Sequence, residues 1–390
     1  MSELSARLAP HYTRFRVAER LLLTGHSHQA WPDVAREGQL EAFDDAAEAV
    51  DEKWARANVK ADAVRDGLRA LLGEPDATIA LGVNTHELVV RFLSAVDLPA
   101  RPRVVTSDAE FHTLRRQLDR LAEVGVEVVP VPATPVETLA DRMALEITEN
   151  TAAALVSSVL FTTSLIVPGL PALAAACRRH GAELLVDAYH ALGVVPFDRS
   201  GLESAWVVGG GYKYLQLGEG NCFLRLPRHA LELRPVVTGW FAEFGDLATP
   251  TRPGEVRYAG GAARFAGSTY DPTSHYRAAR VFDFFAGQGL TPATLRAQSL
   301  RQVGLLAERF DAIEAPPQLI DRDRSRPREA FGGFLSLRTP YAAQLQEALR
   351  ERGVLTDSRG QWLRFGPAPY LSDEQLVAAM DALAAALPTG

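Results

Sequence analysis

Short apolar runs alternate with longer amphipathic segments through the first half of this 390-residue chain, and this alternation restricts the fold more than any other feature. The short runs, which predict strands, are 78–82, 103–106, 126–131, 153–160 and 184–187. The longer segments, which predict helices, are 54–72, 84–96, 111–124 and 171–180. Strands separated by helices are joined by right-handed crossovers and form a mostly parallel sheet. The sequence therefore predicts an α/β fold whose ligands bind at the carboxyl ends of the strands.

A glycine-rich stretch at 206–225 interrupts this pattern and places a lysine at its centre. Two apolar runs flank the loop, and Lys213 stands in it between Tyr212 and Tyr214. Aromatic neighbours exclude water from an ammonium group and lower its pKa, as Schiff-base chemistry at a lysine requires. A solvated lysine in a hairpin is the simpler alternative. Dinucleotide binding by the glycines at 209–211 is disfavoured, because no helix follows them at the required place.

A strand that ends in an acid lies just upstream of this loop. The run 183–187 ends at Asp187, and His190 follows three residues later. In pyridoxal-phosphate enzymes an Asp or Glu pairs with the protonated pyridine nitrogen of the cofactor and keeps its ring an electron sink. Taken alone, Asp187 reads equally well as a turn residue after a strand. The order of a strand-end Asp followed by a Tyr-Lys loop favours the cofactor site.

Four short motifs in this order make the chain resemble the fold-type-I pyridoxal-phosphate enzymes of the aminotransferase class V group, and within it the kynureninase family. They are Asp187-Ala188-Tyr189-His190, Tyr212-Lys213-Tyr214-Leu215, Gly239-Trp240-Phe241 and Leu363-Arg364-Phe365-Gly366-Pro367. The resemblance runs from about Gly25 to Pro369. It implies a fold-type-I architecture, with a mostly parallel seven-stranded sheet in a large domain and a small α+β C-terminal domain.

The resemblance also implies pyridoxal 5'-phosphate as cofactor and gives roles to the residues of these motifs. Lys213 would carry the cofactor covalently, Asp187 would hold its pyridine nitrogen, and His190 belongs to the same motif. Tyr212 is expected to act in catalysis and to contact the cofactor phosphate.

The phosphate is expected at the turn before the helix at 84–96. Free backbone N–H groups and the helix dipole favour an anion there, and Thr85 and His86 fall where the family has Thr-Ser. An ordinary capped helix is the alternative. In the family a phenylalanine stacks on the cofactor ring, which Phe111 matches, although His112 and Leu114 depart from the family pattern. Trp240 and Thr269 match residues that reach the phosphate from the partner subunit.

Substrate contacts are expected from both ends of the chain. Arg364 would bind the substrate α-carboxylate as a bidentate fork, with a surface ion pair as the alternative. Ser27 and His28 lie in a turn that the family places near the substrate. Because His26 and His28 are two residues apart, they would face one side of a strand, but no third ligand stands at a recognised spacing and no metal site is predicted.

Composition excludes several classes of function. The net charge of −7 and the lack of a basic run disfavour nucleic-acid binding. No apolar run is long enough to span a membrane. The N-terminus has no apolar signal segment, and Cys177 and Cys222 allow neither a disulfide framework nor a zinc pattern. We expect a cytoplasmic protein.

Three regions are predicted: an N-terminal segment at 1–50 that packs on the small domain and the rim of the active site, a large cofactor domain at 51–270 and a small domain at 271–390. A homodimer with the active site at the subunit interface is expected.

The leading hypothesis is an enzyme, a hydrolase that cleaves the Cβ–Cγ bond of a kynurenine-type amino acid and releases an aryl acid and alanine. A second hypothesis keeps the cofactor but changes the reaction to transamination, β-elimination or desulfuration. A third is a non-catalytic binding protein on the same scaffold.

Overall fold

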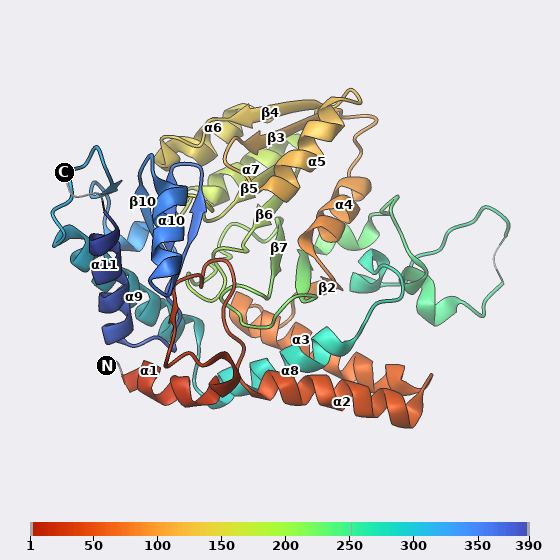
Figure 1. The fold of residues 1–390 in the computed structure, drawn as a ribbon. Coiled ribbons are helices and arrows are strands. Elements are labelled where there is room, and N and C mark those ends of the chain that lie inside the picture. Colours follow the sequence, from red (N-terminus) through yellow and green to blue (C-terminus); the bar gives the residue numbers. More distant parts are fainter. Residues whose placement is uncertain (1–2, 251, 388–390) are drawn as a thin grey trace.

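A computed structural model describes residues 3–250 and 252–387 of the chain. Its largest sheet has seven strands in the order β2-β8-β7-β6-β5-β3-β4 (Figure 1). They are β2 (Thr78–Gly82), β3 (Arg103–Ser107), β4 (Glu127–Val131), β5 (Thr151–Ser157), β6 (Glu183–Asp187), β7 (Trp206–Gly210) and β8 (Cys222–Leu226). Neighbouring strands from β4 to β7 are parallel, whereas β8 is antiparallel to both β7 and β2. The predicted mostly parallel, seven-stranded α/β sheet is confirmed.

Helices cover both faces of this sheet, and the central strand β5 shows why. All seven of its residues are buried. Ala153 and Leu155 pack into the cluster that contains helices α4 and α5, whereas Ala154 and Val156 pack against α6 and α7. A parallel strand covered on both faces needs apolar residues at every position, so its sequence is a continuous apolar run. The four helices are α4 (Thr85–Ala95), α5 (His112–Ala122), α6 (Leu139–Leu145) and α7 (Leu170–His180).

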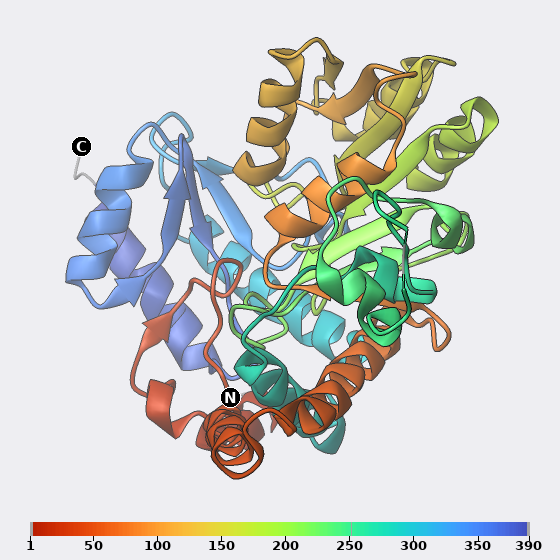
Figure 2. The same cartoon turned by 90° about the vertical axis from the view of Figure 1, so that its right-hand side faces the viewer.

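The C-terminal third forms a second, smaller α+β unit beside the central sheet (Figure 2). Its antiparallel sheet has the order β12-β13-β10-β9. Its elements are α9 (Pro292–Asp311), β9 (Asp321–Arg322), β10 (Leu335–Arg338), α10 (Ala342–Glu351), β11 (Val354–Leu355), β12 (Asp357–Arg359), β13 (Trp362–Phe365) and α11 (Asp373–Ala386). The last helix, α11, begins with a capping box formed by Ser372 and Gln375. The segment 316–324 contains the short edge strand β9.

The N-terminal segment connects the two units. Strand β1 (Leu21–Leu22) pairs with β11, and helix α2 (Val34–Ala49), which the sequence reading missed, packs along α8 (Thr273–Gly287). Helix α3 (Lys53–Leu72) also packs on α8. The remaining short helices are α1 (Glu3–Leu8), η1 (Ala9–His11), η2 (Thr13–Phe15), η3 (Val136–Thr138), η4 (Arg228–Glu232), η5 (Trp240–Asp246), η6 (Gly261–Phe265) and η7 (Arg328–Ala330). The domain boundaries at 50 and 270 stay a prediction.

The segment between β8 and α8 projects away from the body of the molecule (Figure 1). It has little regular structure beyond η4, η5 and η6, and it exposes large apolar side chains. These are Val236, Val237, Trp240, Phe244, Leu247 and Val256. None of the described helices is long and apolar enough to cross a membrane.

Candidate active site

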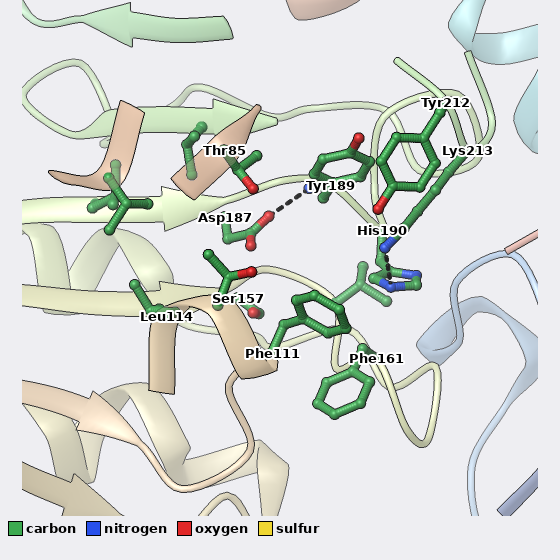
Figure 3. A pocket seen from close by; sticks show the side chains of 15 residues that line it. Thr85, Phe111, Leu114, Ser157, Phe161, Asp187, Tyr189, His190, Tyr212 and Lys213 are labelled. Atoms are coloured by element: carbon green, nitrogen blue, oxygen red, sulfur yellow. Dashed lines mark hydrogen bonds between the residues drawn. The ribbon is translucent and has the colours of Figure 1, made fainter. Parts of the chain in front are cut away.

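A buried pocket lies where β5, β6 and β7 end and helix α4 begins. Of the residues that line it, ten are labelled in Figure 3: Thr85, Phe111, Leu114, Ser157, Phe161, Asp187, Tyr189, His190, Tyr212 and Lys213. The pocket holds about 610 Å³ of non-protein space, part of which is open to solvent. Its position at the carboxyl ends of parallel strands is the one that α/β sheets use for ligands.

Lys213 follows β7 and points into this pocket (Figure 3). Its side chain is 7% exposed, and its Nζ atom lies 2.7 Å from Nε2 of His190 and 4.5 Å from the ring centre of Tyr189. Burial lowers the pKa of Lys213 to about 7, against the opposing charge of Asp187. A substantial fraction of the amine is therefore unprotonated at neutral pH, the form that attacks a carbonyl carbon.

The glycines before Lys213 make room for this arrangement. A Cβ atom on Gly210 would lie 2.4 Å from the hydroxyl of Tyr189, and one on Gly209 would lie 2.8 Å from the ring of Phe223. Both contacts are too close for any side chain. Gly209 and Gly210 thus serve close packing at the end of β7.

Asp187 ends β6 with its carboxylate at the pocket wall. Its Oδ1 atom accepts a hydrogen bond of 2.8 Å from the backbone N–H of Tyr189. Burial raises the pKa of Asp187, although the Tyr189 N–H and the charge of Lys213 oppose the shift. A buried carboxylate held in this way is stabilised by a cation placed against it.

A second buried acid, Glu110, lies behind the pocket and was missed by the sequence reading. Its carboxylate accepts hydrogen bonds of 2.6 Å from the hydroxyls of Ser107 and Ser157 and one of 3.0 Å from the Ser157 backbone N–H. Burial raises the pKa of Glu110 to about 7. Ser157 lines the pocket and is paired in register with Asp187. The signal in the sequence was an acid three residues past the end of a strand, which is too common to single out.

Of the residues predicted to contact the cofactor phosphate or ring, some line the pocket and one lies on the surface. Thr85 lines the pocket as the first residue of α4, whose N-cap Asn84 accepts a hydrogen bond from the Glu87 N–H. His86 is exposed and does not line the pocket. Phe111 forms part of the pocket wall and meets Phe161 edge to face at 5.4 Å. Both rings lie on the same side of the pocket and give it an apolar wall (Figure 3).

The N-terminal turn differs from the expectation for its histidines. Strand β1 ends at Leu22, and the chain turns after Thr24, so His26 and His28 do not share a strand face. His26 is fully buried, whereas His28 is exposed and stacks on the ring of Tyr212 at 4.7 Å. Ser27 lies within 3.2 Å of a ring nitrogen of His28. The expected common face is wrong, because the tight turn sends the two side chains to opposite environments.

No group of three or more His, Cys, Asp or Glu side chains suited to a metal ion occurs among the described residues. The paired histidines of the turn therefore belong to no larger cluster of such ligands in the described part of the chain.

Arg364 lies behind the pocket wall on β13 and is 3% exposed. Its guanidinium donates hydrogen bonds to the carbonyl oxygen of Phe161 and to the carboxylate of Asp357. It does not itself line the pocket, but its charge acts on the pKa of both Lys213 and His190. The surface ion pair considered for Arg364 is excluded by its burial.

Trp240 and Thr269 lie away from the lysine pocket in this single chain. Trp240 is 43% exposed on the projecting segment. Thr269 lines a separate, larger cavity together with Gly267, Ser268 and residues of β2. Neither residue lines the lysine pocket of its own chain.

Comparisons with known proteins find similar sequences in two enzyme families. Residues 295–383 match the family model described as the kynureninase C-terminal domain. The kynureninase of Burkholderia pseudomallei is 27% identical over 320 residues, which cover 78% of this chain and 73% of that protein. The isopenicillin N epimerase of Streptomyces clavuligerus is 28% identical over 342 residues, or 82% of each chain.

Solved structures share the fold at lower sequence identity. A mutant of the cystine C-S lyase C-DES, with glycine covalently linked to its PLP cofactor, superposes with a TM-score of 0.83 at 19% identity, covering 96% of this chain and 98% of the other. A cysteine desulfurase from Escherichia coli gives a TM-score of 0.79 at 16% identity, with 98% of both chains covered.

The pocket fits pyridoxal phosphate, the cofactor of this group. It offers a partly unprotonated amine at Lys213, a buried carboxylate at Asp187 and a helix N-terminus at Thr85. These match the aldehyde, the pyridine nitrogen and the phosphate of that molecule. In its fold, its C-terminal segment and its relatives, the chain is similar to the kynureninase-like, pyridoxal-phosphate-dependent enzymes of fold type I.

Proposed function

We propose that this protein hydrolyses the Cβ–Cγ bond of a kynurenine-type amino acid, giving an aryl acid and alanine. The observation that carries the proposal is the presence of Lys213 and Asp187 in one buried pocket next to a C-terminal domain that matches the kynureninase model. Pyridoxal phosphate, when bound, supplies an electron sink for negative charge that develops on substrate carbons next to the amine.

Each residue has a role that its environment supports. The amine of Lys213 holds the cofactor and, with a pKa of about 7, can take a proton from Cα and return it near neutral pH. Asp187 keeps positive charge at the pyridine nitrogen. Thr85 and the first turn of α4 hold the phosphate, with Tyr212 at its edge.

The apolar wall of Phe111 and Phe161 excludes water from one side of the cofactor ring. Arg364 takes the substrate carboxylate, with Ser27 and His28 at the rim. The stacking of His28 on Tyr212, which lines the pocket, supports this position for the turn.

The direct test is to incubate the pyridoxal-phosphate-loaded protein with L-kynurenine and with 3-hydroxy-L-kynurenine and to assay for alanine and for the aryl acid. Equal amounts of the two products support the proposal. Turnover of the amino acid without alanine points to another reaction of the same group.

A second candidate reaction is epimerisation at Cα, favoured by the relative named isopenicillin N epimerase, which aligns over 82% of the chain. It needs the same electron sink and a proton acceptor, but no C–C cleavage. Exchange of the Cα hydrogen with solvent deuterium, without alanine formation, would identify it. Transamination and β-elimination remain alternatives that product analysis separates.

Desulfuration through the chain's own thiols is disfavoured. Cys177 and Cys222 are both free and buried, and burial raises the pKa of each thiol to about 12. A thiol in that state is a poor sulfur acceptor. Two free, buried cysteines also fit the reducing cytoplasm that we propose as its location. A non-catalytic scaffold has no need of a buried lysine whose pKa is lowered, which argues against that alternative.

We further propose a homodimer that completes the site with Trp240 and Thr269 from the partner subunit. The projecting apolar segment supports it, since large apolar surfaces of this kind mark protein interfaces.

A further inference from the structure

Two buried glutamines hold the backbone on either side of Lys213. This lysine lies in the segment between β7 and β8, residues 211–221, which we call the lysine loop. The backbone N–H of Gln29, just after the N-terminal turn, donates a hydrogen bond of 3.3 Å to the Tyr212 carbonyl oxygen. The backbone N–H of Gln216 donates one of 3.2 Å to the Lys213 carbonyl oxygen. The peptide groups before and after the lysine are therefore both held in place.

The side chains of the two glutamines also bind each other. Nε2 of Gln216 donates a hydrogen bond of 2.8 Å to Oε1 of Gln29. Both residues are buried, and Gln216 is fully excluded from solvent. Because a buried amide without a partner is costly, each side chain restrains the other. The N-terminal segment and the lysine loop are thus joined through backbone and side chains at one place.

Tyr12 holds this pair from the N-terminal side. Its hydroxyl donates a hydrogen bond of 2.5 Å to Oε1 of Gln216. Its ring is fully buried and packs against the ring of Tyr370 at 4.7 Å. The hydroxyl of Tyr370 accepts a hydrogen bond of 2.9 Å from the backbone N–H of Ala30, next to Gln29. The lysine loop is therefore supported by residues that do not themselves line the pocket.

The backbone of Gln216 has a conformation that few residues other than glycine adopt. Its φ angle is +60°, in the left-handed region, where the Cβ atom of an L-residue crowds the following carbonyl oxygen. Such a conformation persists only where surrounding contacts hold it. The two side-chain hydrogen bonds of Gln216 supply that restraint, three residues after Lys213.

We infer that the glutamine pair, held by Tyr12, positions the amine of Lys213 by fixing the backbone of the lysine loop. Gln29 and Gln216 are then positioning residues, which act through the lysine and not on a ligand. Without them the loop would relax to a less strained backbone, and the amine would leave its place beside His190. The inference rests on the proposed function, because it takes Lys213 as the residue that holds the cofactor.

A displaced amine would have a different pKa. Burial is the largest cause of the lowered pKa of Lys213, and the charged groups that also act on it are Asp187, Asp357, Arg359 and Arg364. The neighbouring His190, Tyr189 and Tyr212 are uncharged at neutral pH, because burial lowers the pKa of the first and raises that of the others. An amine that turns toward solvent therefore recovers a pKa nearer to its ordinary value.

The test uses Gln216→Met, which keeps the length of the side chain and removes both of its hydrogen bonds. The matched control is Gln346→Met on helix α10. Gln346 likewise accepts one side-chain hydrogen bond, from the hydroxyl of Ser358, and donates one, to the Thr356 carbonyl oxygen. Both variants thus lose one accepted and one donated hydrogen bond, but only the first loses them at the lysine loop.

Two quantities are measured on the cofactor-free protein. The first is the pKa of the Lys213 amine, obtained from the pH dependence of its reductive methylation and peptide mapping. Lys53 and Lys60, both on α3, serve as references within the same sample. The second is the dissociation constant of pyridoxal phosphate, followed by absorbance.

In Gln216→Met the pKa of Lys213 should rise from about 7 toward the ordinary lysine value of about 10.4. Pyridoxal phosphate should bind roughly tenfold more weakly, because the amine is misplaced. Gln346→Met should leave both quantities as in the wild type, whatever its effect on thermal stability. Wild-type values in Gln216→Met, or equal changes in the two variants, would overturn the inference.

Tyr12→Phe is a second arm should Gln216→Met not fold, because it removes one hydroxyl and keeps the ring packed on Tyr370. It should change both quantities in the same direction by a smaller amount. Adding it to Gln216→Met should change neither quantity further, since the hydroxyl acts through Gln216. Wild-type values in Tyr12→Phe, or an additive effect in the double variant, would contradict the inference.

Neither quantity depends on turnover, so the inference and the proposed function can fail separately. If the wild type forms no alanine from kynurenine but Gln216→Met changes both quantities, the proposed reaction is wrong and the positioning role stands. If alanine forms and Gln216→Met matches the wild type in both quantities, only the positioning role is wrong. If the cofactor is attached to another lysine, the inference falls with the role of Lys213.

Discussion

The Nζ atom of Lys213 lies 2.7 Å from Nε2 of His190, and both groups are buried. Burial lowers the pKa of both, so the pair carries less positive charge at neutral pH than the same two groups would carry in water. The contact fixes the direction of the lysine amine before any cofactor arrives. The free amine is thereby oriented over the ring of Tyr189, toward the centre of the pocket (Figure 3).

Reduction of the loaded protein with borohydride should attach the cofactor permanently to Lys213. The chain has only three lysines, Lys53, Lys60 and Lys213, so peptide mapping decides the site without ambiguity. Lys213→Ala should abolish both the label and turnover, whereas Lys53→Ala should leave both intact. A label on Lys53 or Lys60 would refute the assignment.

Asp187→Asn should retain the cofactor with weaker affinity and lose turnover by a factor of roughly 10²–10³, the usual cost of removing one preorganised electrostatic contact. The amide keeps the hydrogen bond from Tyr189 but cannot hold a proton on the pyridine nitrogen. The cofactor dissociation constant and kcat are measured together. An Asn variant with full turnover would remove Asp187 from this role.

Glu110 should make the cofactor-free protein less stable as the pH rises from about 4.5 to 7. Its pKa is raised to about 7 in the folded state, so the folded state holds a proton that the unfolded state has released. The stabilisation is present below pH 4.5 and lost above pH 7, and its size is about 3 kcal/mol. Denaturant unfolding of Glu110→Gln should show a flatter profile across this range. Identical profiles for the two proteins would contradict the prediction.

Arg364→Lys should raise the Michaelis constant roughly tenfold or more with a smaller effect on kcat, because an ammonium cannot reproduce the planar fork of a guanidinium. The comparison is made with the substrate that the alanine assay identifies. Thermal unfolding serves as the control, since a loss of affinity that only follows a loss of folded protein would not count.

Size-exclusion chromatography should show a dimer, and the double variant Val236→Asp/Phe244→Asp should dissociate it and weaken cofactor binding. Both side chains are exposed and apolar on the projecting segment. Leu145→Asp, a change at an exposed leucine of α6, is the matched control and should stay dimeric. A monomer that binds the cofactor as tightly as the wild type would exclude contributions of Trp240 and Thr269 from a partner.

The strands and helices of the large sheet could be predicted because burial on both faces leaves a direct trace in sequence. The apolar runs at β3, β5 and β6 and the helix faces of α3 and α4 are local patterns. Helix α2 was missed because it packs through small residues such as Ala35, Gly38 and Ala42, which give a weak apolar pattern.

Part of the site could be predicted because some of its residues belong to local sequence patterns. Lys213, Asp187 and Tyr212 stand in short local motifs, and the structure brings them into one pocket. Glu110 and Asp357 could not be predicted, because the partner of each is brought close only by folding. Glu110 binds Ser157 on another strand, and Asp357 is placed by the register of β12 with β13. The opposite directions of His26 and His28 depend on one tight turn that no periodicity encodes.

Gly210 shows how a backbone position can govern reactivity without touching a ligand. The hydroxyl of Tyr189 occupies the space that a side chain on residue 210 would need. The ring of Tyr189 packs against the amine of Lys213. In a library of substitutions, alanine at position 210 would count as mild on a hydrophobicity scale. Its Cβ atom would nevertheless displace the ring of Tyr189, against which the amine of Lys213 packs. A screen that selects only for folded protein would accept variants at position 210 in which the amine of Lys213 is misplaced.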